Sequence, residues 1–437
     1  MTIENRISNF LAELGDQDEN LFPYMANRKT GFDPEKDSVY YSGPYWDSRE
    51  VSVAIESLIK GQWLTSGAAV NKFERRFSKY FGFEDSLMVN SGSSANLVMI
   101  AALKKYFGWQ DGDEIIVSVV GFPTTISAII QNNLTPVFVD ISWHDLNWDL
   151  NLIENLISPK TRAVFSSPVL GNPYDVDGLL TITERHNLQL INDNCDSLGS
   201  KWKGKYLTEY GVAASCSFYP AHHITTMEGG MVSSNIEEVV KLARSFAWWG
   251  RACYCVGKQN LLKDGTCKNR FSEWIPNCDV AVDHKYVFEN VGYNLKPLDL
   301  QGAIGLVQLE KFEEIDLLRN QNKTRINEIF AKISGCHVVQ ELDEAHCSWF
   351  GAPIVCETSN LKRKLVSHLE NNRVQTRNYF AGNILMQPAY TQYGDWRKYP
   401  NASDVLGKVF FVGVSPTITR EMMDYIEKVV DDFVGRE

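Results

Sequence analysis

The chain has 437 residues, of which 44% are hydrophobic and 12% aromatic, enough to fill the cores of one large and one smaller domain. Its net charge of −11 would repel a phosphate backbone, so we expect no nucleic-acid partner. No segment approaches the roughly 18 consecutive apolar residues of a membrane helix, and the first residues do not resemble a secretory signal. We therefore expect a cytoplasmic protein that has no membrane partner.

Residues 1–50 are polar and irregular, and we expect them to form an N-terminal arm. From residue 51 onward, short apolar runs alternate with segments of helical periodicity. This alternation predicts an α/β fold, with a mostly parallel, doubly wound sheet in a large domain over residues 51–300. The runs that we predict to be strands are residues 115–120, 136–140, 163–167, 188–193 and 214–219.

The alternation stops at residues 251–290, which contain cysteines, glycines and lysines with little periodicity. A segment of this length without regular structure is predicted to be a long excursion from the large domain. Residues 298–330 then predict one long amphipathic helix. This helix leads into a smaller C-terminal α+β domain over residues 301–437.

Two short motifs follow predicted strands. In the first, at residues 90–96, small side chains let the backbone amides of Gly92, Ser93 and Ser94 approach an anion at a helix N-terminus, although a plain capping turn has the same residues. In the second, Asp193 ends a strand, where ligands bind in open α/β sheets. Asp193 is therefore placed to pair with a cofactor ring nitrogen, or simply to cap a loop.

The third motif, SFYPAHHITTMEGG at residues 217–230, makes a family resemblance plain. From about residue 63 onward, the three motifs in this order resemble the DegT/DnrJ/EryC1/StrS family of sugar aminotransferases and dehydratases. The resemblance implies an aspartate aminotransferase-like fold (fold type I) and a vitamin B6 cofactor. In the family, the sixth residue of this motif is the lysine that binds the cofactor covalently, and here it is His222.

The exchange of lysine for histidine determines the expected chemistry. An imidazole cannot form the imine that the lysine forms, so the cofactor, pyridoxamine 5′-phosphate or its aldehyde form, would be held without a covalent bond. An imidazole can act as a base near neutral pH. We therefore expect His222 to be catalytic, while the role of His223 stays open.

The resemblance implies further contacts with the cofactor. Ser217 and the amides of the first motif would hold its phosphate, and Phe122 would stack on its ring, although a core position is the alternative for Phe122. Asn294 would reach the phosphate from a second subunit, which implies a homodimer.

The cysteines separate two subgroups that have histidine in place of the lysine. One subgroup is iron-free and takes its amino group from glutamate; the other binds a [2Fe-2S] cluster. Three cysteines match the spacing of the iron-sulfur subgroup: Cys195, Cys253 and Cys255. The fourth ligand would be Cys267, although the interval between Cys255 and Cys267 is longer than in the family. Cys278 is the alternative for this fourth position. Four thiolates are the usual ligands of such a cluster. The other interpretation is that these residues are ordinary loop thiols.

The iron-sulfur subgroup implies reductive removal of the C3 hydroxyl of a CDP-linked 4-keto-6-deoxyhexose, toward a 3,6-dideoxysugar of O-antigen or lipopolysaccharide. No G-x-G-x-x-G fingerprint follows a predicted strand, so a separate NAD(P)H-dependent flavin or iron-sulfur reductase would supply the electrons. Two alternatives remain: an iron-free, glutamate-coupled GDP-4-keto-6-deoxymannose 3-dehydratase, and a non-catalytic regulator that binds sugar nucleotides.

Overall fold

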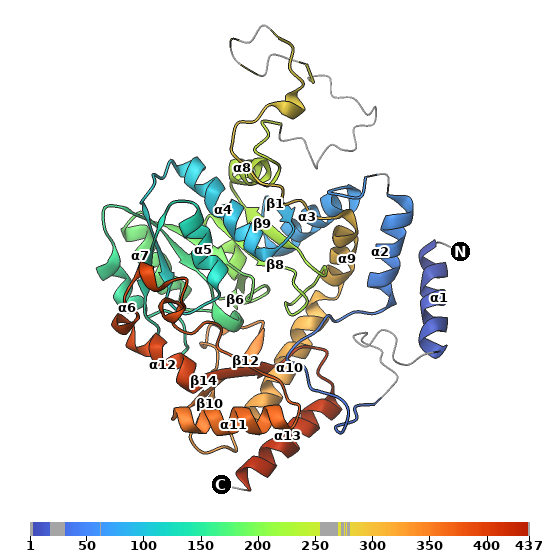
Figure 1. Cartoon of the computed structure of the whole chain (residues 1–437), viewed down its shortest axis with the longest axis vertical. Coiled ribbons are helices and arrows are strands. Elements are labelled where there is room, and N and C mark those ends of the chain that lie inside the picture. Colours follow the sequence, from blue (N-terminus) through green and yellow to red (C-terminus); the bar gives the residue numbers. More distant parts are fainter. Residues whose placement is uncertain are drawn as a thin grey trace.

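The large part of the molecule is built on a seven-stranded sheet. The computed structural model describes residues 3–17, 31–61, 63–253, 270–271, 275, 277 and 280–435. Neighbouring strands from β8 to β3 are parallel, whereas β9 is antiparallel to both of its neighbours. The doubly wound α/β prediction is confirmed (Figure 1). In spatial order the strands are β1 (Asp85–Val89), β9 (Gly230–Ser234), β8 (Ala213–Ser217), β5 (Gln189–Asp193), β4 (Thr161–Ser166), β2 (Glu114–Ser118) and β3 (Thr135–Val139).

Helices cover both faces of this sheet, because side chains along each strand alternate between two apolar cores. In β2, Ile115 and Val117 pack in one core with helices α4 (Gly92–Phe107), α5 (Pro123–Gln131) and α8 (Glu237–Ala247). Ile116, between them, packs in another core with α7 (Val176–Arg185). Near β1, the same face is covered by α3 (Ala68–Phe81). The short helix α6 (Leu150–Ile153) precedes β4.

The C-terminal part contains an antiparallel sheet with strands in the order β10-β12-β14-β13. Helices pack against it in a separate core. The predicted boundary at residue 300 falls inside α9, which packs on α3, and the limits of the domains stay a prediction. The elements are β10 (Cys336–Val338), β12 (Gly351–Cys356), β14 (Val409–Gly413), β13 (Thr376–Asn378), α9 (Asp299–Glu310), α10 (Phe312–Phe330), α11 (Ser359–Asn371), α12 (Pro400–Lys408) and α13 (Arg420–Val434). A third, small sheet joins β11 (Ala345–His346), β6 (Lys201–Trp202) and β7 (Lys205–Tyr206).

The N-terminal arm is not irregular, as predicted, but begins with helix α1 (Ile3–Gln17). Apolar residues recur there at helical spacing, and Leu11 is buried. Helix α1 lies beside α2 (Ser48–Lys60), with Ser8 Oγ 2.9 Å from Ser52 Oγ (Figure 1). The arm is therefore partly folded onto the large part of the molecule.

The long helix predicted over residues 298–330 is instead two helices, α9 and α10, which meet at Lys311. The Lys311 side chain is buried, with its Nζ 2.7 Å from Glu50 Oε1 and 3.0 Å from Asp47 Oδ2. The Lys311 amide donates to Gln308 O at 3.1 Å, a tighter bond than the helical i to i−4 pattern. Lys311, at the junction of the two helices, thus forms ion pairs with Glu50 in α2 and with Asp47, the N-cap residue of α2.

The predicted excursion leaves and re-enters the body at one place. The Ala252 amide donates to Val287 O at 2.9 Å, and Arg251 forms a β-bridge with Phe288. In the second half of the excursion, the residues that the structure describes from Arg270 onward extend outward beyond α8 (Figure 1). Cys255, Cys267 and Cys278 lie outside the described residues, so their predicted role as ligands has no structural counterpart here.

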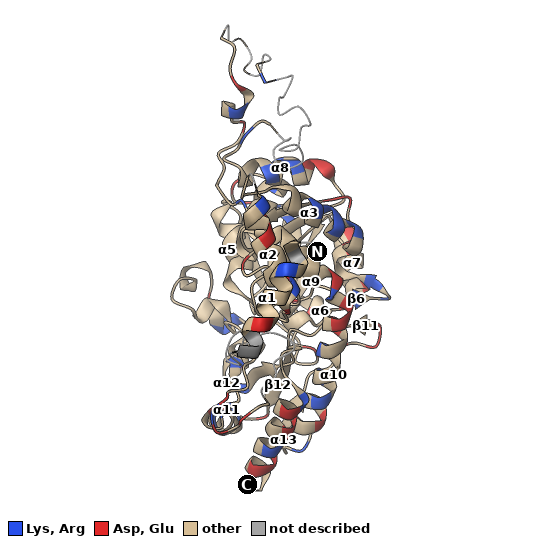
Figure 2. Ribbon diagram, turned by 90° about the vertical axis from the view of Figure 1, so that its right-hand side faces the viewer, with Lys and Arg blue, Asp and Glu red and all other residues tan. Residues whose placement is uncertain are grey.

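The surface helices contain both acidic and basic residues. In Figure 2, α10 and α13 each contain acidic and basic residues, and Arg325 of α10 pairs with Glu427 of α13. Among the described residues, none of the helices combines the length and the apolar character needed to cross a membrane.

Replacing Lys311 by Met should lower the free energy of unfolding by about 3–5 kcal/mol, because the buried Glu50 carboxylate loses its cation. Urea denaturation followed by circular dichroism measures this change. Lys332→Met is the matched control, since the Lys332 pairs with Glu427 and Asp431 lie at the surface and contribute about 0–1 kcal/mol. Equal losses in the two variants would contradict the assignment.

Candidate active site

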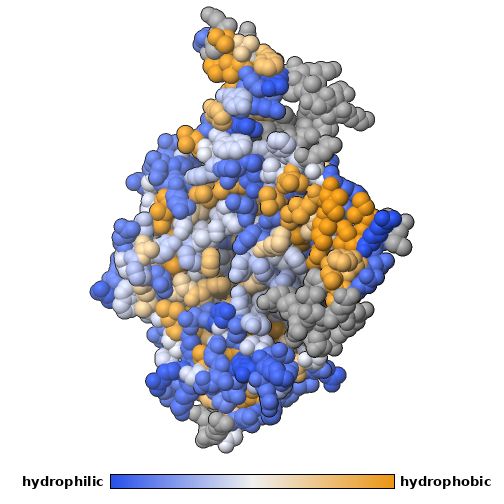
Figure 3. Space-filling model, turned by 45° about the vertical axis from the view of Figure 1, so that its right-hand side comes forward, coloured by the Kyte–Doolittle hydropathy of each residue, from blue (hydrophilic) through white to orange (hydrophobic). Residues whose placement is uncertain are grey.

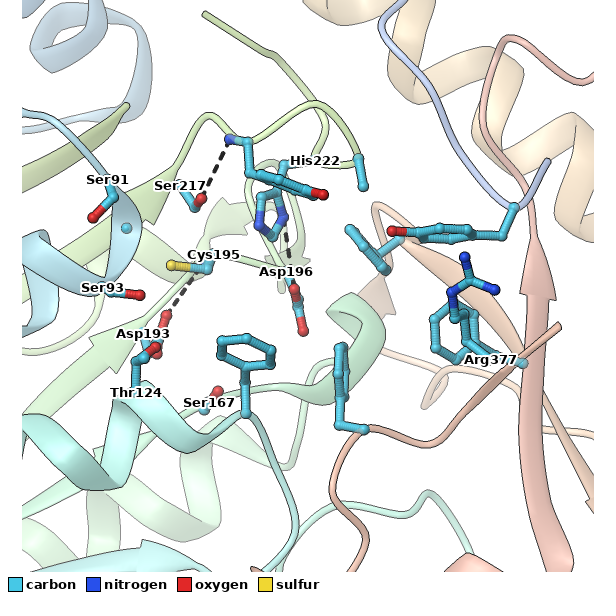
Figure 4. Close-up of a pocket in the computed structure, with 18 of the residues that line it drawn as sticks. Ser91, Ser93, Thr124, Ser167, Asp193, Cys195, Asp196, Ser217, His222 and Arg377 are labelled. Carbon is cyan, nitrogen blue, oxygen red and sulfur yellow. Dashed lines mark hydrogen bonds and ion pairs between the residues drawn. The ribbon is translucent and has the colours of Figure 1, made fainter. Parts of the chain in front are cut away.

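A cavity of about 720 Å³ lies at the carboxyl ends of the parallel strands. One wall comes from the segments that follow the strands of the large sheet, and the opposite wall comes from residues around the antiparallel sheet (Figure 4). This is the edge at which open α/β sheets bind ligands. The lining residues are Tyr41, Ser91, Gly92, Ser93, Phe122, Thr124, Ser167, Asp193, Cys195, Asp196, Ser217, Tyr219, Ala221, His222, Glu228, Phe350, Arg377, Asn378, Phe380 and Phe411.

Asp193 is the last residue of β5, and its carboxylate is buried but fully engaged in hydrogen bonds. Its Oδ2 accepts from Asn96 Nδ2 and from Thr125 Oγ1, both at 2.7 Å. Its Oδ1 accepts from the Cys195 amide at 3.1 Å and from Ser215 Oγ at 3.4 Å. None of these four donors is charged. The carboxylate is therefore held rigidly while its charge is left to attract a cationic ligand group.

The N-terminus of α4 forms the part of the cavity predicted to bind an anion. Ser91 caps the helix, because its Oγ accepts from the Ser94 amide at 3.0 Å. Gly92 and Ser93 line the cavity, whereas Ser94, whose amide serves the cap, does not. A Cβ on Gly92 would lie 2.5 Å from the Ser217 Cβ, so only glycine lets these two segments approach. The helix dipole and free amides at this end favour an anion.

Phe122 presents its ring to the cavity instead of to a core. Its side chain is 52% exposed, and it precedes α5 as the N-cap residue. The ring contacts Phe380 edge-on, with the centroids 6.1 Å apart. The core alternative is thus excluded for Phe122, whose exposed ring lines the cavity.

His222 lies in the turn between β8 and β9, where its amide donates to Tyr219 O at 3.0 Å. Its ring packs against Phe350, with the centroids 5.2 Å apart, and its Nδ1 lies 3.6 Å from Asp196 Oδ1 (Figure 4). Nδ1 has no hydrogen-bond partner among the described residues. Burial, together with repulsion by the Arg319 guanidinium, lowers the pKa of His222 to about 3. The imidazole is therefore neutral at physiological pH.

The pKa of Asp196 is shifted in the opposite direction to that of His222. Burial, followed by repulsion from Asp193, raises the pKa of Asp196 to about 8, although the Leu170 amide donates to its carboxylate. Near neutral pH this carboxyl is therefore mainly protonated beside a neutral imidazole.

His223 points away from the cavity. It is buried, and its Nε2 lies 2.7 Å from Ser348 O, consistent with an Nε2–H that donates to this carbonyl. Burial lowers the pKa of His223, so its ring is also neutral. The contact joins the His222 turn to the segment before β12, which gives His223 a structural role that the sequence analysis left open.

Several lining residues were not predicted from the sequence. Arg377, in β13, is the only lysine or arginine among the described residues that line the cavity, and its guanidinium lies 4.3 Å from the Tyr41 ring centroid. These two residues are distant in sequence, so no local pattern joins them. Asp196, three residues after Asp193 at a strand end, could have been found by the same strand-end argument.

Two predicted site residues lie elsewhere in the described structure. Asn294 pairs with Trp248 in a β-bridge and accepts a hydrogen bond from Lys296, and it does not line the cavity. Cys253 is buried where the excursion begins, whereas Cys195 lines the cavity. The described residues contain no group of three or more histidine, cysteine or acidic side chains that could hold a metal ion.

Comparisons with known proteins show which family this chain resembles in sequence and in structure. The sequence model of the DegT/DnrJ/EryC1/StrS aminotransferase family matches residues 47–431. The lipopolysaccharide biosynthesis protein RfbH of Salmonella typhimurium is 35% identical over 99% of this chain and 98% of its own. The dTDP-4-dehydro-2,6-dideoxy-D-glucose 3-dehydratase of Saccharopolyspora spinosa is 36% identical over 90% and 86%. An E. coli GDP-4-keto-6-deoxy-D-mannose-3-dehydratase with bound hydrated PLP superposes with a TM-score of 0.78 and 29% identity, over 90% of this chain and 99% of its own.

The protonated Asp196 carboxyl should make stability fall with pH. An unfolded chain ionises this group near pH 3.8, whereas the folded protein keeps its proton up to about pH 8. Its contribution is therefore complete below about pH 4 and is lost as the pH rises through 8. Chemical denaturation between these pH values should show this decline in the wild type and a weaker one in Asp196→Asn. An identical pH dependence in the two proteins would contradict the assignment.

Proposed function

We propose that this chain, which belongs to the DegT/DnrJ/EryC1/StrS aminotransferase family, removes the C3 hydroxyl of a nucleotide-linked 4-keto-6-deoxyhexose with a vitamin B6 cofactor. The observation that carries the proposal is the neutral imidazole of His222 in the cavity, at the position where the family has its lysine. An imidazole can exchange protons there but cannot hold the cofactor covalently. Relatives over most of the chain are named as sugar 3-dehydratases, which supports an enzyme and not a regulator.

The residues of the cavity fit pyridoxamine 5′-phosphate. The Asp193 carboxylate, which has no cationic partner among its four donors, would pair with a protonated ring nitrogen. The α4 N-terminus and Ser217 would hold the phosphate, and Phe122 would face the ring. When bound, this cofactor supplies an amine for the C4 ketone of the sugar and a ring that withdraws electrons.

The remaining residues of the chain would bind the sugar nucleotide and move protons. We assign to His222 the removal of a proton at the reacting centre, since its Nδ1 forms no hydrogen bond among the described residues and the ring is neutral. An imidazolium formed in this site is a strong acid, so it readily returns the proton to a departing hydroxyl. Arg377, across the cavity, supplies the positive charge that a diphosphate requires.

Replacing His222 by Asn should leave cofactor binding intact but lower dehydration about 10²–10⁴-fold, because the amide cannot accept the proton. Exchange of the cofactor methylene protons with deuterated solvent, followed by NMR, measures the proton transfer directly. His346→Asn is the matched control, since His346 pairs with Asp316 at the surface, 2.8 Å away. Turnover that persists in His222→Asn would place the base elsewhere.

We also infer a homodimer in which Asn294 serves the partner's cofactor. Apolar side chains gather over α1 and α2 (Figure 3), where Phe10, Leu58, Ile59 and Trp63 are exposed. A monomer seldom exposes such a group of large side chains without a partner. This surface supports association between copies.

We further propose, on the basis of the cysteine spacing, that the enzyme belongs to the iron-sulfur subgroup and acts on a CDP-linked sugar. Cys195 lines the cavity two residues after Asp193, and Cys253 begins the excursion that contains Cys255 and Cys267. A [2Fe-2S] cluster on these residues would supply single electrons from a separate NAD(P)H-dependent reductase.

Iron analysis and EPR of anaerobically purified protein test this finer proposal. We expect about two iron atoms per chain and a reduced-cluster signal, both lost in Cys195→Ser and Cys253→Ser. Cys216→Ser and Cys347→Ser, at buried cysteines outside the set, are the matched controls. Iron-free protein that turns over GDP-linked sugar with glutamate alone would instead establish the iron-free alternative.

A further inference from the structure

Arg319 of α10 is a buried cation that the proposed chemistry has not used. Its side chain is 1% exposed, and within the described residues it forms no ion pair. Two other buried cations have carboxylate partners: Arg244 pairs with Glu74 at 3.3 Å, and Lys311 with Glu50 at 2.7 Å. The buried Lys323 and Lys362, like Arg319, donate to neutral oxygens instead. Burying a guanidinium without a carboxylate is costly, and an apolar residue of similar size would avoid the cost.

The two Nη groups of the guanidinium donate to four main-chain carbonyls from two segments, while Nε has no hydrogen-bond partner among the described residues. Its Nη2 donates to His222 O at 3.0 Å and to Ala221 O at 3.3 Å. Its Nη1 donates to Trp349 O at 3.1 Å and to Phe350 O at 3.2 Å. Only a planar fork with several N–H donors can join four carbonyls in this way, whereas a lysine ammonium is a single point of charge.

These two segments carry the two rings that meet in the cavity. The His222 imidazole packs against the Phe350 ring at a centroid distance of 5.2 Å, and both residues line the cavity. Since Arg319 holds the main chain of both, it fixes the position of the imidazole relative to the opposite wall. His223 adds a second link between the same segments through Ser348 O.

The charge of Arg319 also acts on the imidazole. Burial lowers the pKa of Arg319 to about 10, so the guanidinium remains charged at neutral pH. This charge disfavours a second cation at His222. The other titratable groups around the ring are Asp196, His223 and Tyr219, with Arg377 and Tyr41 in the far wall of the cavity.

We propose that Arg319 is the positioning residue of the proposed catalytic base: it clamps the His222 and Phe350 main chains together and places a cation beside the imidazole. The proposal rests on the proposed function of His222. A base that is held in one position meets the reacting proton in the same geometry in every cycle.

Two variants separate the clamp from the charge. Arg319→Lys keeps the charge but loses the fork, so we expect kcat to fall at least about tenfold while KM and cofactor absorbance stay within about twofold. Arg319→Gln removes the charge, so we expect an acid limb, absent from the wild type, to appear in the pH profile of kcat as the pKa of His222 rises. Arg244→Lys and Arg244→Gln, at the other buried arginine, are the matched controls and should change stability without either effect.

Histidine NMR of the cofactor-free protein gives a readout that needs no turnover. With ring-labelled histidine and the His222 signal assigned by its absence in His222→Asn, we expect one pH-independent signal in the wild type down to about pH 5. In Arg319→Lys this signal should shift or broaden, and in Arg319→Gln it should begin to titrate at the acid end.

The outcomes distinguish this proposal from the proposed function. Wild-type kcat and a superimposable His222 signal in Arg319→Lys overturn the clamp, and a flat signal with an unchanged pH profile in Arg319→Gln overturns the role of the charge. If Arg319→Gln does not fold, Arg319→Lys still tests the clamp. A wild-type protein that dehydrates no nucleotide sugar contradicts the proposed function, and the NMR signals then decide the role of Arg319.

Discussion

The buried carboxylate of Asp193 is the interaction on which the large part of the molecule converges. Its four hydrogen bonds come from Asn96 in α4, Thr125 in α5, Ser215 in β8 and the Cys195 amide after β5. A buried charge that accepts four neutral donors is held in place but not neutralised. The sheet edge, the N-terminal half of α4 and the cavity wall are therefore organised around one carboxylate that has no cationic partner among its donors.

A second constraint lies on the other side of the cavity, where charge has the opposite sign. Arg319 joins the His222 turn to the segment before β12 through carbonyl oxygens, and Arg377 faces the cavity from β13. His222 thus lies in the cavity between the Asp193 carboxylate and the cationic side chain of Arg377. Perturbed titrations of His222 and Asp196 in opposite directions are the pattern expected of an acid–base site.

Secondary structure was predictable where periodicity alone decides it. The five parallel strands of the large sheet (β2, β3, β4, β5 and β8) lie within a few residues of their predicted positions, because buried parallel strands are short apolar runs between turns. The edge strand β1 and the antiparallel β9 were not among the predicted runs. Helix α1 was missed because polar residues mask its apolar face, and the predicted helix over residues 298–330 was broken at Lys311. The ion pair of Lys311 with Glu50, 261 positions earlier, leaves no signal in the local sequence.

The sequence by itself determined the α/β class, the strand-end aspartate, the glycine at the α4 N-terminus and the histidine in place of lysine. Each of these depends on residue type at a local spacing. Only the tertiary structure decided that burial lowers the pKa of His222 and raises that of Asp196, that Phe122 is exposed to the cavity, and that Arg319 and Arg377 reach the site. Burial and charge at a site are sums over neighbours from distant segments, and these neighbours meet only when the chain has folded.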